Sequence, residues 1–357
     1  MEVVGRKRET SLLKKALISP KSELIAVYGR RRVGKTFLID VVYAKDKYFE
    51  ITGLHNGDIA DQLEHFYNTL KATWSANKKV DKPTSWFEAF DLLEKYVLAS
   101  RRKSKKVIFI DEFPWMDTPR SKFLMAFENF WNSFAAKRND LVVVICGSAA
   151  AYMVKRVVKN KGGLHNRITE HIKLSPFNLH ETEAFLQSKG IKLTKYDILQ
   201  LYMVMGGVPH YLDKINPGES VAQIIDRLCF SGDGALHNEF ENIFESLFNH
   251  HEKHVALIKA LTSKKKGLTR SELVKISGLS SGGTFTKALD ELMESGFIGQ
   301  FYPYKKKLKD SVYKLTDEFS LFYLKFMQNK KRLPFEQRQG KQSFYAIFLV
   351  LPRCLIK

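Results

Sequence analysis

Residues 24–36 read Leu-Ile-Ala-Val-Tyr-Gly-Arg-Arg-Arg-Val-Gly-Lys-Thr, and this stretch decides the fold. Within it, residues 29–36 match the pattern G-x-x-x-x-G-K-[ST] in full. The apolar run 24–28 is typical of a buried strand, and helical periodicity begins at Thr36. A strand, a glycine-bounded loop and a helix in this order predict a phosphate-binding loop.

The residue types in this loop suit phosphate chemistry. Gly29 and Gly34 allow the backbone to curve so that its N–H groups point inward, and the following helix adds partial positive charge. We expect Lys35 to reach the β- and γ-phosphates and the Thr36 hydroxyl to ligate Mg²⁺. The sequence therefore predicts ATP or ADP as ligand and Mg²⁺ as cofactor. The predicted nucleotide-binding residues here are Gly29, Arg30, Arg31, Arg32, Val33, Gly34, Lys35, Thr36 and Phe37.

A second element supplies acidic groups. Residues 107–112 read Val-Ile-Phe-Ile-Asp-Glu, a strand that delivers two carboxylates to the edge of a parallel sheet where ligands bind. Asp111 is predicted to hold Mg²⁺ through water, beside the Thr36 hydroxyl that ligates the ion. Glu112 is predicted to polarise the attacking water, which is the role of a general base in a hydrolase.

A third element is the apolar run 141–146, which ends in Gly147-Ser148. If this strand lies beside residues 107–110, Ser148 is placed next to Asp111. Two interpretations stay open for Ser148: a catalytic group that bonds the γ-phosphate or the water, and an ordinary cap at the end of a strand.

The first half of the chain alternates strand and helix signals. This alternation predicts a five-stranded parallel sheet with helices on both faces, an α/β fold with right-handed crossovers. The expected strands are residues 24–28, 48–52, 107–110, 141–146 and 171–174. The expected helices are residues 36–44, 59–74, 86–98, 121–136 and 149–158.

The second half reads differently, and we divide the chain into four parts. Residues 1–177 are the predicted ATPase core, 178–248 a helical lid, 249–327 a winged helix and 328–357 a tail. The lid helices are expected at 181–189, 195–205, 220–230 and 235–248. The winged helix is predicted from helices at 255–261, after Thr269 and at 284–295, and from strands at 297–302 and 311–315.

Charge and composition indicate the kind of partner. Lys plus Arg number 58 and Asp plus Glu 38, giving a net charge of +20; residues 1–170 carry +12, 171–250 carry −4 and 251–357 carry +12. A basic surplus attracts polyanions, although solubility alone is the plain alternative. Three cysteines in a chain of this length do not make a disulfide framework, so we expect a cytoplasmic protein. No apolar run has membrane-spanning length, so we expect that the protein does not enter a membrane.

The residues quoted so far, with several others, are similar to those of the archaeal-type AAA ATPases. This P-loop family is related to the STAND regulators and to origin-recognition ATPases. Besides the triple arginine, the resemblance rests on Gly206-Gly207-Val208-Pro209 and covers about residues 1–325. The other supporting motifs are Val4-Gly5-Arg6, Ile110-Asp111-Glu112-Phe113, Cys146-Gly147-Ser148, and Arg167 ahead of Leu174-Ser175-Pro176-Phe177.

The resemblance implies further roles. Gly5 and Arg6 would lie against the adenine, and Pro209 in the lid would close over the base. Arg167 would sense the γ-phosphate, often across a subunit boundary in a homo-oligomer, and such an arginine can be worth about 10³–10⁵ in rate. A plain surface position for Arg167 and a solvated face for the triple arginine remain alternatives. Relatives commonly continue into a nuclease-like domain. The tail of this chain is too short to form one, so we expect no nuclease activity, whether the tail is a truncation or the lineage's natural end.

The sequence thus predicts a Mg²⁺-dependent ATP hydrolase that works as a nucleotide-driven conformational switch, linked to DNA or to a protein partner. The rival is a nucleotide-dependent DNA-binding or regulatory module that hydrolyses slowly or not at all. For duplex DNA, the predicted contacts are Lys305, Lys306, Lys307 and Lys309 in the wing. The acidic residues of the third helix, 284–295, equally favour a winged helix used for protein contacts or autoinhibition.

Overall fold

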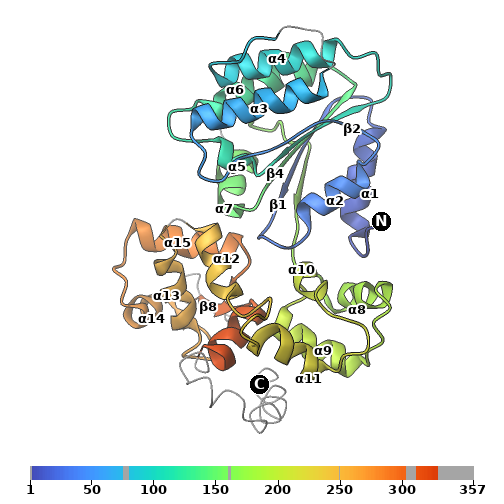
Figure 1. The fold of residues 1–357 in the computed structure, drawn as a ribbon. Helices are drawn as coiled ribbons and strands as arrows, with labels where there is room; N and C mark the ends of the chain where they lie inside the picture. Colours follow the sequence, from blue (N-terminus) through green and yellow to red (C-terminus); the bar gives the residue numbers. More distant parts are fainter. Residues whose placement is uncertain (1, 75–79, 160–161, 249, 303–310, 329–357) are drawn as a thin grey trace. The chain divides into compact units, whose positions relative to one another are not determined.

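The computed structural model describes residues 2–74, 80–159, 162–248, 250–302 and 311–328. It divides into two compact units (Figure 1). Unit 1 comprises Met1–Gly29 and Gly34–Leu174, and unit 2 comprises Arg30–Val33 and Ser175–Lys357. The four residues inside the glycine-bounded loop therefore pack with unit 2, although the chain on either side of them belongs to unit 1.

Unit 1 is built on a parallel sheet of five strands. The order is β2-β3-β4-β1-β5, so β1, which leads into the loop, lies between β4 and β5. The strands are β1 (Glu23–Tyr28), β2 (Lys47–Thr52), β3 (Lys106–Asp111), β4 (Leu141–Gly147) and β5 (Glu170–Lys173). Every residue of β3 and β4 is buried, which explains their nearly continuous apolar sequence. The five predicted strands are confirmed.

Helices cover both faces of this sheet (Figure 1). One face carries α3 (Ile59–Thr73), α4 (Trp86–Leu98) and α6 (Phe123–Asn129); the other carries α1 (Lys7–Leu17) and α2 (Lys35–Val42). Alternate residues of the strands supply the two cores. Leu24, Ile108 and Val143 pack with the aromatic side chains of α3, α4 and α6. The P-loop NTPase fold predicted for this part is present.

Unit 2 begins with a group of short helices. They are α8 (Leu179–Ser188), α9 (Lys195–Met205), α10 (Pro209–Leu212), α11 (Val221–Ile225) and α12 (Glu239–Leu247). Three helices start with a reciprocal capping box, in which Asn178, Thr194 and Ser220 each bond the backbone three residues on. The helix predicted at 235–248 starts four residues later, because Gly234 closes a turn with Ser231 before α12.

The rest of unit 2 combines three helices with a small antiparallel sheet of order β6-β8-β7. Its elements are α13 (Glu252–Leu261), β6 (Leu268–Thr269), α14 (Arg270–Ser277), α15 (Gly283–Glu294), β7 (Ile298–Phe301), β8 (Val312–Leu315) and α16 (Glu318–Phe322). Among the described residues, buried hydrophobic side chains from Phe177 to Met327 form one connected core. The winged-helix assignment and the boundary between lid and winged helix stay predictions.

Two helices of unit 1, α6 and the short α7 (Ala150–Tyr152), continue beyond their α-helical residues. Each continues as a π-helical segment, Phe130–Phe134 and Met153–Val158 respectively, which together account for the predicted helices 121–136 and 149–158. In the described ranges, no helix combines the length and the apolar character needed to cross a bilayer.

Candidate functional site

The phosphate loop leaves β1 at a point where no side chain fits. Gly29 has φ 152°, and a Cβ added there would lie 2.1 Å from the carbonyl oxygen of Leu174. This oxygen is fixed, because the Leu174 N–H donates to the Tyr28 carbonyl at 2.7 Å as β5 ends beside β1. Glycine is therefore required by a close backbone approach at the start of the loop.

Further along the loop, φ is positive at Arg32 (70°) and at Gly34 (85°), but not at Val33 between them. Such alternation turns successive backbone N–H groups toward one concave side and makes an anion-binding nest. Gly34 adopts this conformation freely, whereas for Arg32 it costs roughly 1–2 kcal/mol. Contacts from outside the loop are therefore needed to keep Arg32 in this backbone conformation.

The lysine and threonine of the motif open α2. Lys35 is its first residue and is buried, with 7% of the side chain exposed. The Thr36 hydroxyl donates to Oδ2 of Asp111 at 2.6 Å, which joins the start of α2 to the end of β3. The structure thus brings together the two residues predicted to hold Mg²⁺.

The acidic pair adopts a strained turn at the sheet edge. Glu112 has φ 44° and caps α5 (Phe113–Met116), while its N–H donates to Oδ1 of Asp111 at 2.8 Å. Both oxygens of Asp111 are consequently in use. Strained backbone of this kind clusters at active sites and ligand clamps, so the conformation of Glu112 supports the hypothesis of a functional position.

Ser148 follows β4 and contacts Glu112 twice. Its backbone N–H and its hydroxyl both donate to Oε2 of Glu112, at 3.1 and 2.8 Å. Only 2% of Ser148 is exposed. The side chain therefore orients the Glu112 carboxylate, and the catalytic role assigned to Ser148 stays a prediction.

Cys146, the neighbouring residue of β4, lies close to this group. Burial raises the pKa of the Cys146 thiol well above its ordinary value, and the charge of Asp111 raises it further while Lys35 opposes the shift. The thiol is neutral at physiological pH. Within the described residues, no cluster of three or more His, Cys, Asp or Glu side chains has metal-binding geometry.

The chemistry of the donors fits Mg²⁺ all the same. A hydroxyl and a carboxylate oxygen 2.6 Å apart are hard ligands, and Mg²⁺ commonly takes one or two such protein oxygens and completes its shell with water and phosphate. We infer that Thr36 and Asp111 would hold the ion.

Two arginines of the loop pair with carboxylates of unit 2. Arg30 is 5% exposed and forms an ion pair with Asp317, and the Arg32 Nε lies 2.9 Å from Oε1 of Glu239. For Arg30 the solvated alternative was wrong, because its guanidinium is enclosed by unit 2. Asp317 and Glu239 were missed in the sequence, since an isolated acidic residue at a helix start carries no local signal of its partner.

The residues predicted to enclose the adenine lie in different units. Gly5 and Arg6 have φ of 70° and 53°, and Arg6 precedes α1 with 6% exposure. Phe37 in α2 is 41% exposed, and Pro209 is the first residue of α10. Their contact with a base stays a prediction.

Arg167 lies at the opposite edge of the sheet from the loop. It is exposed and precedes β5, whose first residue Glu170 pairs with Ile25 near the start of β1, whereas the loop follows the end of β1. β1 is six residues long, and a strand advances about 3.3 Å per residue. This position favours a role of Arg167 across a subunit boundary, or a plain surface position, over direct action on the phosphates of its own chain, and the role of Arg167 stays a prediction.

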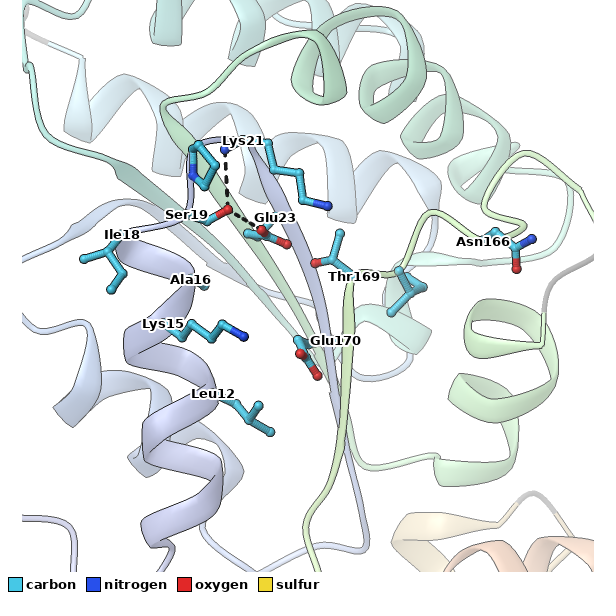
Figure 2. A pocket seen from close by; sticks show the side chains of 12 residues that line it. Leu12, Lys15, Ala16, Ile18, Ser19, Lys21, Glu23, Asn166, Thr169 and Glu170 are labelled. Atoms are coloured by element: carbon cyan, nitrogen blue, oxygen red, sulfur yellow. Dashed lines mark hydrogen bonds between the residues drawn. The ribbon is translucent and has the colours of Figure 1, made fainter.

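A hollow of about 590 Å³ lies at this same distal edge, and Figure 2 shows the side chains that line it. Lys15 and Ile18 at the end of α1, Glu23 at the start of β1, and Thr169 and Glu170 at the start of β5 line it. It is not part of the phosphate site. The wing lysines Lys305, Lys306, Lys307 and Lys309 lie outside the described residues, so the DNA contact stays a prediction.

Comparisons with known proteins agree with this geometry. Residues 3–215 match the family model of an ATPase domain predominantly from Archaea. An uncharacterized protein of Methanocaldococcus jannaschii, MJECL04, is 23% identical over 327 residues, which cover 91% of this chain and 68% of that protein.

Solved structures share the fold. The Walker-type ATPase PABY2304 of Pyrococcus abyssi superposes with a TM-score of 0.63 at 15% identity, covering 90% of this chain and 96% of that one. The Aeropyrum pernix ORC2 protein, solved as ADPNP–ADP complexes, gives a TM-score of 0.51 at 12% identity, covering 98% and 96%. Since the family model covers more than half of the sequence, the chain belongs to the family of ATPase domains found predominantly in Archaea.

Proposed function

We propose that this protein is a Mg²⁺-dependent ATP hydrolase that uses nucleotide turnover to switch conformation. The observation that supports this most directly is the chain of hydrogen bonds from Thr36 through Asp111 and Glu112 to Ser148. It supports the assignment of Thr36 and Asp111 to Mg²⁺ and of Glu112 to the attacking water, because these side chains are linked to one another and Thr36 directly follows the loop.

The roles follow from the positions of these groups. The inward N–H groups of the loop and the Lys35 ammonium bind the phosphates, and Thr36 with Asp111 holds the ion, which when bound neutralises developing charge. Glu112 accepts a proton from the attacking water. Ser148 keeps the Glu112 carboxylate in one orientation by donating to Oε2 at 2.8 Å.

Arg167 would complete a neighbouring subunit's site in a homo-oligomer, because its own loop is at the far edge of the sheet. Mixing Arg167→Ala with Glu112→Gln protein tests this. Mixed oligomers would contain sites with an intact Glu112 and an intact Arg167 from different chains, and partial recovery of turnover is expected. No recovery would remove Arg167 from the mechanism.

The central experiment separates binding from turnover. Glu112→Gln keeps size and hydrogen-bonding atoms but cannot accept the proton, so nucleotide affinity should persist while phosphate release falls about 10²–10⁴-fold. Glu64→Gln is a matched control, because the exposed Glu64 carboxylate pairs only weakly with Lys82 on the surface. Unchanged turnover in Glu112→Gln would contradict the assignment.

The same measurement addresses the rival function. A chain that binds nucleotide tightly but releases no phosphate, with or without duplex DNA, would be a nucleotide-dependent binding module. The net charge of +12 on residues 251–357 is what favours a DNA partner.

A further inference from the structure

The four residues between the loop's glycines have their partners in unit 2. Arg30–Val33 is grouped with Ser175–Lys357, whereas Gly29, Gly34 and the whole sheet belong to unit 1. Two ion pairs and one backbone hydrogen bond are among the contacts that hold the segment.

The first contact fixes Arg30. Its guanidinium pairs with Asp317, and the two side chains are 6% and 2% exposed. The Arg30 Cζ also lies 5.3 Å from the ring centroid of Phe297. Asp317 is itself immobilised, because its Oδ2 caps α16 by accepting from the Ser320 N–H at 2.8 Å. Arg30 is therefore attached to a rigid helix start.

The second and third contacts fix Arg32. Its Nε lies 2.9 Å from Oε1 of Glu239, and the same oxygen accepts from the Tyr211 hydroxyl at 2.8 Å. Glu239 is 1% exposed, and burial raises its pKa while Arg32 lowers it. In addition, the His210 N–H donates to the Arg32 carbonyl at 3.4 Å. Side chain and backbone of Arg32 are thus held together.

These contacts act on Arg32, the residue of the phosphate nest whose backbone conformation is strained. Arg32 adopts φ 70°, a conformation that is strained for a residue with a side chain and persists only when the surroundings impose it. Glu239 contacts the side chain of Arg32 and the His210 N–H contacts its carbonyl. These contacts act on both parts of the residue and can impose its backbone conformation.

We propose that Asp317 and Glu239 are positioning residues for nucleotide binding, acting through Arg30 and Arg32 on the shape of the phosphate nest. The inference rests on the proposed nucleotide site. It makes phosphate affinity depend on two carboxylates of unit 2, and by linkage bound nucleotide strengthens those pairs by the same factor. Unit 2 then responds to nucleotide through the loop itself.

The test uses the full-length protein and titration with a fluorescent ADP analogue. Asp317→Asn retains an acceptor for the α16 cap, and Glu239→Gln retains an acceptor for Tyr211, so each removes mainly the charge. Each should weaken ADP affinity about tenfold, equivalent to about 1.4 kcal/mol. Matched controls are Asp213→Asn, an exposed partner of Lys189, and Glu241→Gln, in α12 two residues beyond Glu239. Both should bind like wild type.

Double variants distinguish a positioning role from a merely structural one. Glycine adopts φ 70° without strain, so in an Arg32→Gly background the loop no longer needs Glu239. Adding Glu239→Gln to Arg32→Gly should then cost no further affinity. Likewise, Asp317→Asn combined with Arg30→Gln should lose no more than the worse single variant. Full additivity in both cycles would overturn the proposal.

Two failures are distinguishable. If the wild type itself does not bind ADP, the proposed nucleotide site is wrong. If the wild type binds and Asp317→Asn and Glu239→Gln bind equally well, the site stands and the positioning role is wrong. Thermal melting without nucleotide identifies a variant that does not fold, and for it the Arg32→Gly background supplies the decisive comparison.

Discussion

The two halves of the phosphate loop are held by different parts of the chain. The downstream half, Lys35 and Thr36, opens a helix of the sheet unit, and Thr36 bonds Asp111, 75 residues away. The upstream half, Arg30 and Arg32, pairs with carboxylates of unit 2, and Asp317 is 287 residues from Arg30. The first half carries the residues proposed to bind phosphate and Mg²⁺, and the second half carries the two arginines that pair with carboxylates of unit 2.

The largest effect is expected in the downstream half, from Lys35→Ala. In the proposed site the buried Lys35 ammonium would donate charge-assisted hydrogen bonds to phosphate, each worth about 1.5–3 kcal/mol, so the loss of two should reduce ATP affinity at least a hundredfold. Equilibrium titration with ATP measures this, with Lys47→Ala as control, since Lys47 pairs with Asp40 and Glu50. Equal binding by Lys35→Ala and wild type would falsify the site.

The next effect separates the glycines at the two ends of the loop. Gly29→Ala puts a Cβ 2.1 Å from the Leu174 oxygen, a backbone atom, and should lower the free energy of unfolding by about 3 kcal/mol or more. At Gly34 (φ 85°) nothing lies within 4 Å, so Gly34→Ala should cost only the backbone strain, about 1–2 kcal/mol. Urea unfolding compares them, and equal losses would mean that β5 yields to the new side chain.

The features that the sequence predicts, and those that it does not, divide between the downstream and upstream halves of the loop. The strands of the parallel sheet and the meeting of Thr36 with Asp111 were predictable, because buried parallel strands are continuously apolar and the motif spacing is local. The boundaries of these five strands shifted by about one residue, and β6, with two residues, gave too short a signal to be recognised.

The upstream partners were not predictable. Nothing near Glu239 or Asp317 shows that their carboxylates meet arginines of a loop more than two hundred residues earlier. The pairing depends on the tertiary packing of α10, α12 and α16, which no periodicity encodes. The position of Arg167 was equally hidden, since its distance from the loop follows from strand order and direction rather than from spacing along the chain.

The smallest expected effect concerns the upstream half of the loop and is a dependence of folding stability on pH. Burial, and next the charge of Asp317, raises the pKa of Glu318 to about 7, while Arg30 and a backbone hydrogen bond oppose the shift. The folded protein thus binds this proton more tightly than the unfolded chain. The stability gained is complete below the unfolded pKa and is lost as pH rises through about 7. Allowing for a half-buried side chain, the loss between pH 5 and 8 is about 2 kcal/mol.

Glu318→Gln should remove this dependence, and the difference between wild type and variant in urea unfolding at several pH values isolates it from other titrating groups. The control is Glu245→Gln in α12, which keeps Glu318 and should reproduce the wild-type profile. Because Glu318 follows Asp317, its ionisation places a second negative charge beside the Arg30 pair, so the pH dependence belongs to the half of the loop that unit 2 holds. A Glu318→Gln profile as steep as that of the wild type would show that the carboxylate titrates near its ordinary pKa and that the pocket around the Arg30 pair is well solvated.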